Sequence, residues 1–499
     1  MLQQLTPGVI LAIIVAYFLL LIAISYLTSR NADSQTFFLA GRSSNWMVVA
    51  FGMIGASLSG VTFISIPGVV GAGGANQAFS YMQMVFGYLL GYLVIATVLL
   101  PLYYRLGLTS IYEYLEQRFG FFSYKTGAAF FLISRIVGAS FRLYLVAIVL
   151  QAFVMSAFGV PFWATVLVTI VLIWVYTFQG GINTIIWTDT LQTFCMLTAV
   201  VLTLFGISSA LETNIGGLIG MIQESNYSQV FFFEGGWSDP NNFFKQFFAG
   251  ALITIVMTGL DQDMMQKNLS LPNIKDAQKN MFTFSIILVF ANLLFLALGA
   301  ALYLYASQVG LDIPDKTDQL FPTIALQNLS PAVGIVFILG LIAAAYSSAD
   351  SALTALTTSF CVDFLDFEKK EREPSQQKRI RFGVHIGFSL VLFLVIIVFN
   401  AINDTAVISK LFEWAGYTYG PILGLFTFGM LTKLNVRDNL VLPICIAAPL
   451  LSYFLNYYSE EILYGFQFGF LIIALNGLLT FLGLLAISYR TYGTEEEGS

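Results

Sequence analysis

Small and hydroxyl-bearing residues recur at helical spacing within an apolar stretch that runs from about Pro331 to Asp363. Successive members are three or four positions apart and so share one face of a helix; they are Ala344, Ser347, Ser351, Thr354 and Thr358. Asp350 lies one position off this face. Hydroxyl and carboxylate oxygens are the donors that hard cations prefer, and an ionisable side chain inside a membrane span is costly and commonly functional. The pattern indicates a sodium site, with close helix packing as the alternative for the hydroxyls alone.

A second carboxylate, that of Asp189, lies inside the apolar stretch 181–211. It is about eight residues from the expected cytoplasmic end of that helix, or roughly 12 Å at about 1.5 Å per residue. That depth is compatible with a cation site shared with Asp350. An ion pair with an intramembrane arginine is the alternative.

Two arginines, Arg135 and Arg142, also lie within an apolar stretch, and their separation of seven places them on the same helix face. A guanidinium is always charged and binds a carboxylate through two parallel hydrogen bonds. One of the two is a candidate anchor for an anionic substrate. The competing prediction, favoured for at least one of them, is an internal pair with Asp189, Asp350 or Glu413.

The stretch 45–72 has glycines and hydroxyls at its centre, in the run Gly55-Ala56-Ser57-Leu58-Ser59-Gly60-Val61-Thr62. Such a helix is prone to break, and a break frees carbonyls that bind an ion or substrate where lipid is excluded. The stretch 243–262 is a weaker second candidate, because of Gly250, Thr254, Thr258 and Gly259. The five-span separation between the two stretches is the spacing that an inverted repeat of five helices produces.

The elements that must hold these residues are membrane helices. Hydrophobic residues make up 58% of the 499-residue chain and charged residues 10%, against about 25% charged in soluble domains. We therefore predict an all-α polytopic membrane protein with about 13 transmembrane helices. Their expected ranges are 6–28, 45–72, 78–105, 122–157, 161–179, 181–211, 243–262, 277–307, 331–363, 379–400, 405–432, 438–457 and 463–489. The sequence shows no nucleophile–base pair and no metal-ligating cluster, so an enzyme is not expected.

Lys and Arg residues gather in alternate loops, with the largest group between Lys369 and Arg381. Cytoplasmic loops carry such an excess. We therefore expect a multi-pass protein of the cell membrane with its N-terminus outside and its C-terminus in the cytoplasm. Lys267, Lys275 and Lys279 are assigned to one of the cytoplasmic loops. The lipid bilayer is an expected partner, nucleic acid is not, and no oligomer is required.

The chain resembles the solute:sodium symporter family, which includes sodium/glucose, sodium/proline and sialic-acid transporters. The resemblance covers nearly the whole chain. It is carried by Gly180-Gly181 with Trp187-Thr188-Asp189 and Gln192, by Gly259-Leu260-Asp261-Gln262 with Gln266, by Ala344 with Ser347-Ser348 and Ser351, and by Gly420-Pro421. It implies a single transporter domain, 1–499, with a LeuT-like fold. On that fold 6–28 is a leading helix, 45–211 and 243–432 are two inverted five-helix repeats, and 438–489 holds two extra C-terminal helices.

The resemblance also implies binding residues. A general sodium site would use Gly55, Leu58, Ala344, Ser347 and Ser348. A second sodium site, present in some members, would use Asp189, Ser347, Asp350 and Ser351, although this chain has Asp350 where the family pattern has a hydroxyl. Substrate would contact Ser57, Ser59 and Thr62, then Tyr81 or Gln83, and Arg135.

We expect sodium-coupled symport that imports a small polar organic solute, with Na+ as the co-transported ion. The pattern Leu58-Ser59 with Thr62-Phe63 and Arg135 looks more like the sialic-acid transporters than the sugar transporters. It favours a carboxylate-bearing solute, either an acidic sugar such as sialic acid or a monocarboxylate. A neutral sugar or polyol is the alternative. A transporter-like solute sensor is the alternative of another class, and the short tail after Arg490 disfavours it.

Overall fold

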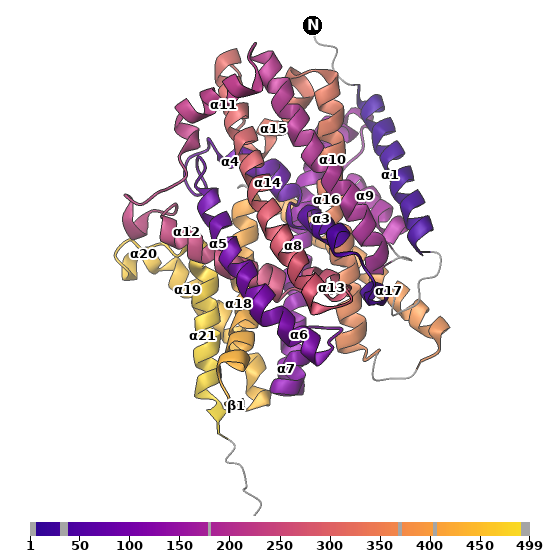
Figure 1. Ribbon diagram of the computed structural model, residues 1–499, viewed down its shortest axis with the longest axis vertical. Coiled ribbons are helices and arrows are strands. Elements are labelled where there is room, and N and C mark those ends of the chain that lie inside the picture. Colours follow the sequence, from indigo (N-terminus) through magenta and orange to yellow (C-terminus); the bar gives the residue numbers. More distant parts are fainter. Residues whose placement is uncertain (1–5, 30–37, 178–180, 368–371, 403–406, 491–499) are drawn as a thin grey trace, which may run out of the picture.

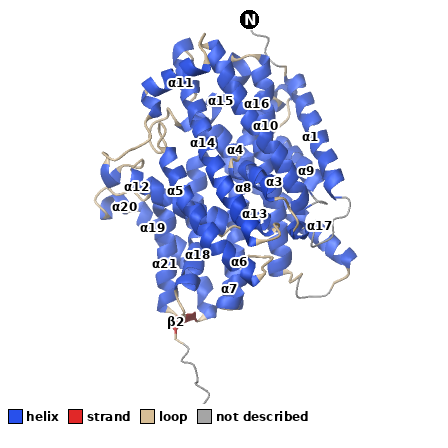
Figure 2. Cartoon of the chain, in the orientation of Figure 1, coloured by secondary structure: helices blue, strands red, loops and turns tan. Residues whose placement is uncertain are grey.

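The computed structural model describes residues 6–29, 38–177, 181–367, 372–402 and 407–490, and most of them are helical (Figure 1, Figure 2). The one strand pair among these residues joins β1 (Asn435–Val436) to β2 (Ser488–Tyr489) in antiparallel register. The all-α prediction is therefore confirmed. Gly180 of the first motif, the end of the predicted span 161–179 and the start of 405–432 lie outside the described residues.

Apolar helices make up the body of the protein. Nine helices among the described residues are long and apolar enough to cross a bilayer, or eleven if each of two bent pairs crosses as one span. The count of about 13 crossings stays a prediction. The long elements are α1 (Pro7–Ser29), α5 (Tyr81–Val94) with α6 (Leu100–Leu106), α8 (Phe121–Phe153), α9 (Phe162–Thr177), α10 (Gly181–Ala210), α14 (Ile274–Val309), α16 (Pro331–Ser359), α17 (Pro374–Ile402), α18 (Val407–Leu431), α19 (Val441–Tyr457) and α21 (Ile472–Ala486).

The connecting segments form two groups, one at each end of the helical body. The short helices α11 (Ile215–Glu224) and α15 (Leu320–Thr323) lie at one end, together with the start of α1 (Figure 1). Helix α7 (Glu113–Arg118) and the strand pair lie at the opposite end. Loops that the span order assigns to one side of the membrane thus lie together in space.

Two membrane helices are broken, as the glycine and hydroxyl runs predict. Helix α3 (Trp46–Ser57) and α4 (Gly60–Val69) meet at 53°. Helix α12 (Phe243–Thr254) continues through a π-helical turn, Ile255–Gly259, and then bends by 62° into α13 (Gln262–Leu269).

The second broken element corrects one boundary. The expected span ended at residue 262, with Lys267 in a cytoplasmic loop. In the structure α13 turns back into the protein, and the Lys267 side chain is 1% exposed. The local cause is Asp261, whose side chain accepts hydrogen bonds from the backbone N–H groups of Asp263 and Met264 and so starts a new helix after the break.

Helices α5 and α12 approach each other closely because glycines face each other's backbones. A Cβ added at Gly87 would lie 2.0 Å from the carbonyl oxygen of Phe247. One added at Gly250 would lie 2.1 Å from the carbonyl oxygen of Met84. Small residues at such crossings replace side-chain packing by backbone contact. This contact holds α5, the helix that follows the broken pair α3–α4, against α12, the first half of the second broken pair.

Gly87→Ala is expected to lower the thermal unfolding midpoint of the detergent-purified protein, because the new methyl group must push α12 away from α5. Overpacking of this kind costs about 1–3 kcal/mol. Gly220→Ala in α11 is the matched control, since a Cβ there meets nothing within 4 Å. Equal midpoints for both variants would contradict the proposed close crossing.

Candidate functional site

The break between α3 and α4 exposes backbone oxygens in the middle of the protein. The last bond of α3 runs from the N–H of Leu58 to the carbonyl of Ile54 at 2.7 Å. The first bond of α4 runs from the N–H of Phe63 to the carbonyl of Ser59 at 3.0 Å. Carbonyls in the final turn of a helix have no intrahelical donor. The carbonyls of Gly55 and Leu58 belong to that turn and are free to act as ligands.

Helix α16 packs against both sides of this break. The position of a Cβ at Gly55 is 3.3 Å from Oγ of Ser347, and that at Gly60 is 4.0 Å from Cα of Ala345. Oγ of Ser348 is 3.5 Å from the carbonyl oxygen of Ala344. The structure thus brings the break in α3–α4 against the part of α16 that carries Ala344, Ser347 and Ser348, and the role of these residues as a general sodium site stays a prediction.

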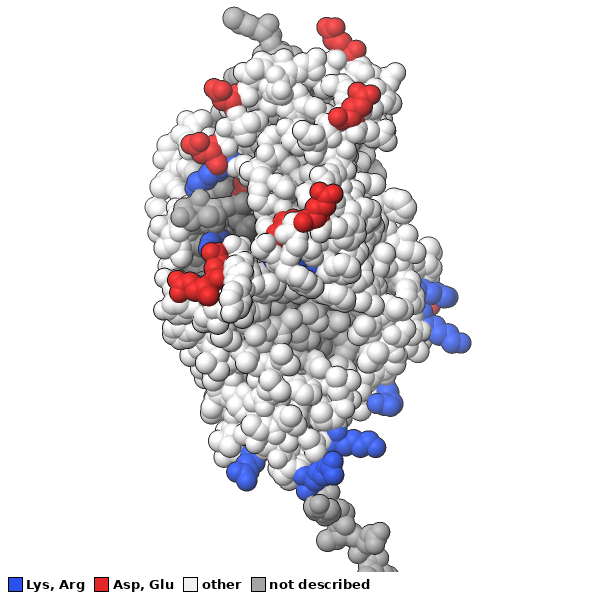
Figure 3. Space-filling model, turned by 90° about the vertical axis from the view of Figure 1, so that its left-hand side faces the viewer, with Lys and Arg blue, Asp and Glu red and all other residues white. Residues whose placement is uncertain are grey.

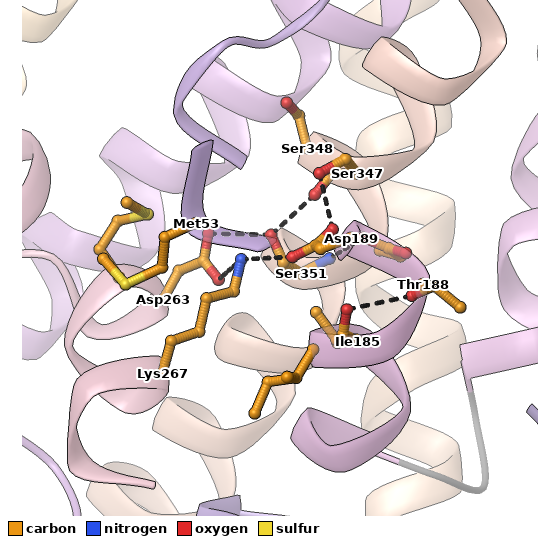
Figure 4. Close-up of polar contacts among 12 residues, drawn as sticks. Met53, Ile185, Thr188, Asp189, Asp263, Lys267, Ser347, Ser348 and Ser351 are labelled. Atoms are coloured by element: carbon orange, nitrogen blue, oxygen red, sulfur yellow. Dashed lines mark hydrogen bonds and ion pairs between the residues drawn. The ribbon is translucent and has the colours of Figure 1, made fainter. Parts of the chain in front are cut away.

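The carboxylate of Asp189, next to the contact between α3 and α16, accepts hydrogen bonds from two donors. Lys267 Nζ donates to Oδ2 at 2.7 Å, and Ser347 Oγ donates to Oδ1 at 2.6 Å (Figure 4). Asp189 and Ser347 are 0% exposed. The predicted alternative, a pair between Asp189 and an arginine, is therefore wrong. Its cationic partner is Lys267, which the pattern of basic loops assigns to a solvent-exposed cytoplasmic loop.

The other predicted members of the second sodium site have separate partners. Oγ of Ser351 lies 3.1 Å from Oδ2 of Asp263 and 3.0 Å from the carbonyl oxygen of Ser347. The carboxylate of Asp350 is buried and accepts a hydrogen bond from the backbone N–H of Ser351 at 2.6 Å. Figure 4 shows Ser347 and Ser351 on the side of α16 that faces Asp189, whereas the hydroxyl of Ser348 points away from it.

Arg135 is one of the two candidate anchors, and it is internally paired. Its guanidinium donates to Oδ2 of Asp263, and its Nη1 lies 3.9 Å from Oδ2 of Asp261. The hydroxyl of Tyr419 in α18 also donates to Oδ2 of Asp261. The prediction of an internal pair for one arginine is confirmed, but the partners come from α13. Glu413, one predicted partner, pairs with Lys410 at 3.1 Å instead.

A cavity of about 80 Å³ lies beside the break in α3 and α4. It is lined by hydroxyls, phenols and two arginines, among them Ser57, Ser59, Thr62, Tyr81, Tyr88, Tyr92, Arg135, Arg142, Thr258 and Asn292. Five of the six predicted substrate positions are in this set. The sixth, Gln83, is a correction to the predicted set: its amide donates to the carbonyl of Asn241 at 2.8 Å and accepts from the N–H of Phe232 at 3.1 Å, so it holds the segment between α11 and α12.

Arg142 differs from Arg135 in its surroundings. It is 7% exposed, and among the described residues no carboxylate lies within 4.0 Å of its guanidinium. Its Nε, like that of Arg135, has no hydrogen-bond partner in the described part of the chain. A buried cationic group without a counter-anion is costly. Arg142 therefore presents unused donors to the cavity.

Sequence patterns alone missed several residues of this site. Asn292 and Tyr92 carry no local signal, because an asparagine or tyrosine in an apolar helix is common. Asp263 and Lys267 do carry one: they lie four positions apart, directly after Gly259-Leu260-Asp261-Gln262, and so share a helix face. Their charge suggested a loop, and only the bend at Asp261 places them inside.

The chain matches the model of the Sodium:solute symporter family over residues 37–437. It is 26% identical over 424 residues to the sodium/sialic acid symporter NanT of Aliivibrio fischeri, which covers 82% of this chain and 80% of that protein. It is also 26% identical over 421 residues to sodium-coupled monocarboxylate transporter 1 of Xenopus laevis, which covers 80% of this chain and 63% of that protein.

Solved structures show the same fold. A substrate-bound, outward-open structure of a Na+-coupled sialic acid symporter superposes with a TM-score of 0.80 at 20% identity, over 96% of this chain and 97% of the other. Mhp1, a nucleobase-cation-symport-1 family transporter in a closed conformation, gives a TM-score of 0.61 at 13% identity, over 90% and 93%. The expected LeuT-like fold is confirmed.

Proposed function

Because the chain belongs to the sodium:solute symporter family, we propose that it is a sodium-coupled importer of a small solute that carries a carboxylate group. It is a multi-pass membrane transporter and not an enzyme, and Na+ is its co-transported ion. The observation that carries the proposed substrate class is that no carboxylate of the described residues lies within 4.0 Å of the buried Arg142 guanidinium. A substrate carboxylate would supply a counter-anion there, and the hydroxyls of Ser57, Ser59 and Thr62, which line the same cavity, would bind the remaining polar groups.

The proposed roles of the two arginines differ. Arg142 binds the substrate carboxylate directly. Arg135 stays with Asp261 and Asp263, where it fixes α13 against α8. Both side chains line the cavity and each has an unpartnered Nε, but among the described residues only Arg135 has a carboxylate within 4.0 Å.

The cavity is small in this conformation. Its volume of about 80 Å³ is well below the roughly 300–1,000 Å³ that ligand pockets enclose. A monocarboxylate needs less expansion than an acidic sugar, and either needs the lining helices to separate before binding. The broken helices α3–α4 and α12–α13 provide the moving parts, because their halves can tilt independently.

We propose that sodium couples this movement to binding. An ion at the break would join the carbonyls of Gly55 and Leu58 in α3 to Ala344, Ser347 and Ser348 in α16. Binding there would favour the conformation in which Ser57 and Ser59 face the substrate. The coupling is reciprocal, so substrate must tighten sodium binding by the same factor.

The proposed orientation has the N-terminus outside. The face in Figure 3 carries most of its Lys and Arg toward the end that holds β1 and β2, and its Asp and Glu gather toward the opposite end. An excess of basic residues is typical of cytoplasmic surfaces. The end with α7, β1 and β2 is accordingly proposed as the cytoplasmic side.

The test of the substrate class is a thermal-shift panel on the purified protein, with sodium or with choline in its place. Monocarboxylates and acidic sugars are expected to raise the unfolding midpoint, and only in sodium. Neutral sugars and polyols serve as controls. Stabilisation by the neutral sugars, with none by the acids, would overturn the acidic substrate class in favour of the sugar alternative.

Ser348→Ala is expected to raise the sodium concentration for half-maximal uptake by roughly 3- to 10-fold, since one oxygen ligand is worth about 1 kcal/mol. The measurement is radiolabelled solute uptake into proteoliposomes across a sodium titration. Ser452→Ala is the matched control, because Ser452 is also buried and also bonds to the carbonyl four residues back. An unchanged sodium dependence for Ser348→Ala would remove α16 from the site.

A further inference from the structure

Three of the four residues predicted for a second sodium site, Asp189, Ser347 and Ser351, lie around a cation in this chain, with Asp263 in the place predicted for Asp350. The amino nitrogen of Lys267 lies 2.7 Å from Oδ2 of Asp189 and 4.0 Å from Oδ1 of Asp263. Ser347 completes the Asp189 side, and Ser351 completes the Asp263 side (Figure 4). The cation is the protein's own side chain, on α13, between α10 and α16.

The donors are those that a hard monovalent cation would take. They are carboxylate and hydroxyl oxygens, with no nitrogen or sulfur among them. One of them, Oδ1 of Asp263, is buried and accepts no hydrogen bond in the described part of the chain, although Lys267 is near. Among the described residues, this oxygen therefore has no donor at hydrogen-bonding distance, and it lies beside the ammonium group.

Charge decides whether a sodium ion can join Lys267 here. Asp189 pairs with Lys267 and Asp263 with Arg135, so these four side chains together are neutral; the next carboxylate, Asp261, lies 3.9 Å from Nη1 of Arg135 and accepts a hydrogen bond from Tyr419. All four side chains are at most 4% exposed. A sodium ion added to the neutral group would sit beside an ammonium in a low-dielectric interior, where like charges repel strongly. Without the ammonium, one negative charge among these side chains would have no compensating positive charge.

We propose that the ammonium of Lys267 permanently occupies the second cation site, so that the transporter couples its substrate to one sodium ion, and that removing Lys267 opens a second sodium site at Asp189, Asp263, Ser347 and Ser351. The inference rests on the proposed sodium symport and specifies its stoichiometry. It assigns to Lys267 the role of a tethered replacement for an ion.

The decisive variant is Lys267→Met, which keeps the side-chain length and removes the charge. The readout is the shift of the unfolding midpoint against the logarithm of sodium concentration, with choline keeping ionic strength constant. The slope reports the number of sodium ions held by the folded state. It is expected to correspond to one ion in the wild type and two in Lys267→Met.

Two further variants locate the gained ion. Lys267→Arg retains the charge and is expected to keep the wild-type slope. Asp189→Asn in the Lys267→Met background removes the ligand and is expected to return the slope to that of one ion. A wild-type slope in Lys267→Met, or an extra ion that persists in the double variant, would overturn the proposal.

Direct counting keeps the test independent of how well Lys267→Met folds. Radioactive sodium bound per wild-type chain is expected to saturate at one, and saturation at two would overturn the proposal on its own. Failure of the proposed function would look different. In that case the wild type would bind no sodium and show no sodium-dependent uptake, whereas failure of this inference alone leaves sodium-driven uptake intact.

Discussion

Arg142→Gln is expected to reduce sodium-driven uptake of a carboxylate-bearing solute by roughly 30- to 5,000-fold, because truncating one partner of a buried charge pair costs about 2–5 kcal/mol. The loss should appear as weaker binding, since the solute's carboxylate would enter the cavity without its counter-charge. The protein itself should remain folded. Arg142 has no carboxylate partner among the described residues, so its removal leaves no buried anion unpaired.

The measurement is initial uptake rate into proteoliposomes over a range of solute concentration, alongside the thermal shift produced by the same solute. Arg142→Lys is the matched variant: it keeps the charge but not the two parallel hydrogen bonds, so an intermediate loss is expected. Wild-type affinity for acids in Arg142→Gln would show that the carboxylate is bound elsewhere.

Arg135→Gln is expected to destabilise the folded protein by about 3–5 kcal/mol, since it leaves buried carboxylates without their guanidinium. Asp263 would lose its guanidinium donor and keep only the Ser351 hydroxyl, and Asp261 would lose the nearby positive charge. The measurement is the unfolding midpoint in detergent without substrate, with Arg142→Gln as the control of identical chemistry on the same helix.

The pair Arg135→Gln and Asp263→Asn sharpens this result. If the contact between Arg135 and Asp263 supplies the stabilisation, the double variant should lose much less free energy of unfolding than the sum of the losses in the two single variants. An unchanged midpoint in Arg135→Gln, combined with lost solute binding, would exchange the roles proposed here for the two arginines.

These two expectations share one physical basis. Both arginines are buried and lie on the same face of α8, and their residue type gives no reason to separate their roles. The difference comes from α13, which brings Asp261 and Asp263 to Arg135, whereas no carboxylate in the described part of the chain lies within 4.0 Å of Arg142. The assignment of function to one arginine and structure to the other is thus a property of helix packing.

Several features were determined by the sequence alone. The break in α3–α4 follows from glycines and hydroxyls in the middle of an apolar stretch, because these residues weaken helix continuity locally. The face of Ser347 and Ser351 follows from helical periodicity. The membrane class follows from composition, and the family motifs fix the order of the elements. Each of these depends on residues close together in the chain.

Only the tertiary structure decided which charges meet. Lys267 and Asp189 are 78 positions apart, and their pairing requires that α13 bend back between α10 and α16. Sequence spacing predicts contacts within one helix, whereas a pair between helices depends on how their axes cross. The charge of Lys267 suggested exposure to water because desolvating an unpaired lysine is prohibitive. The buried carboxylate that pairs with it, Asp189, comes from a distant part of the chain.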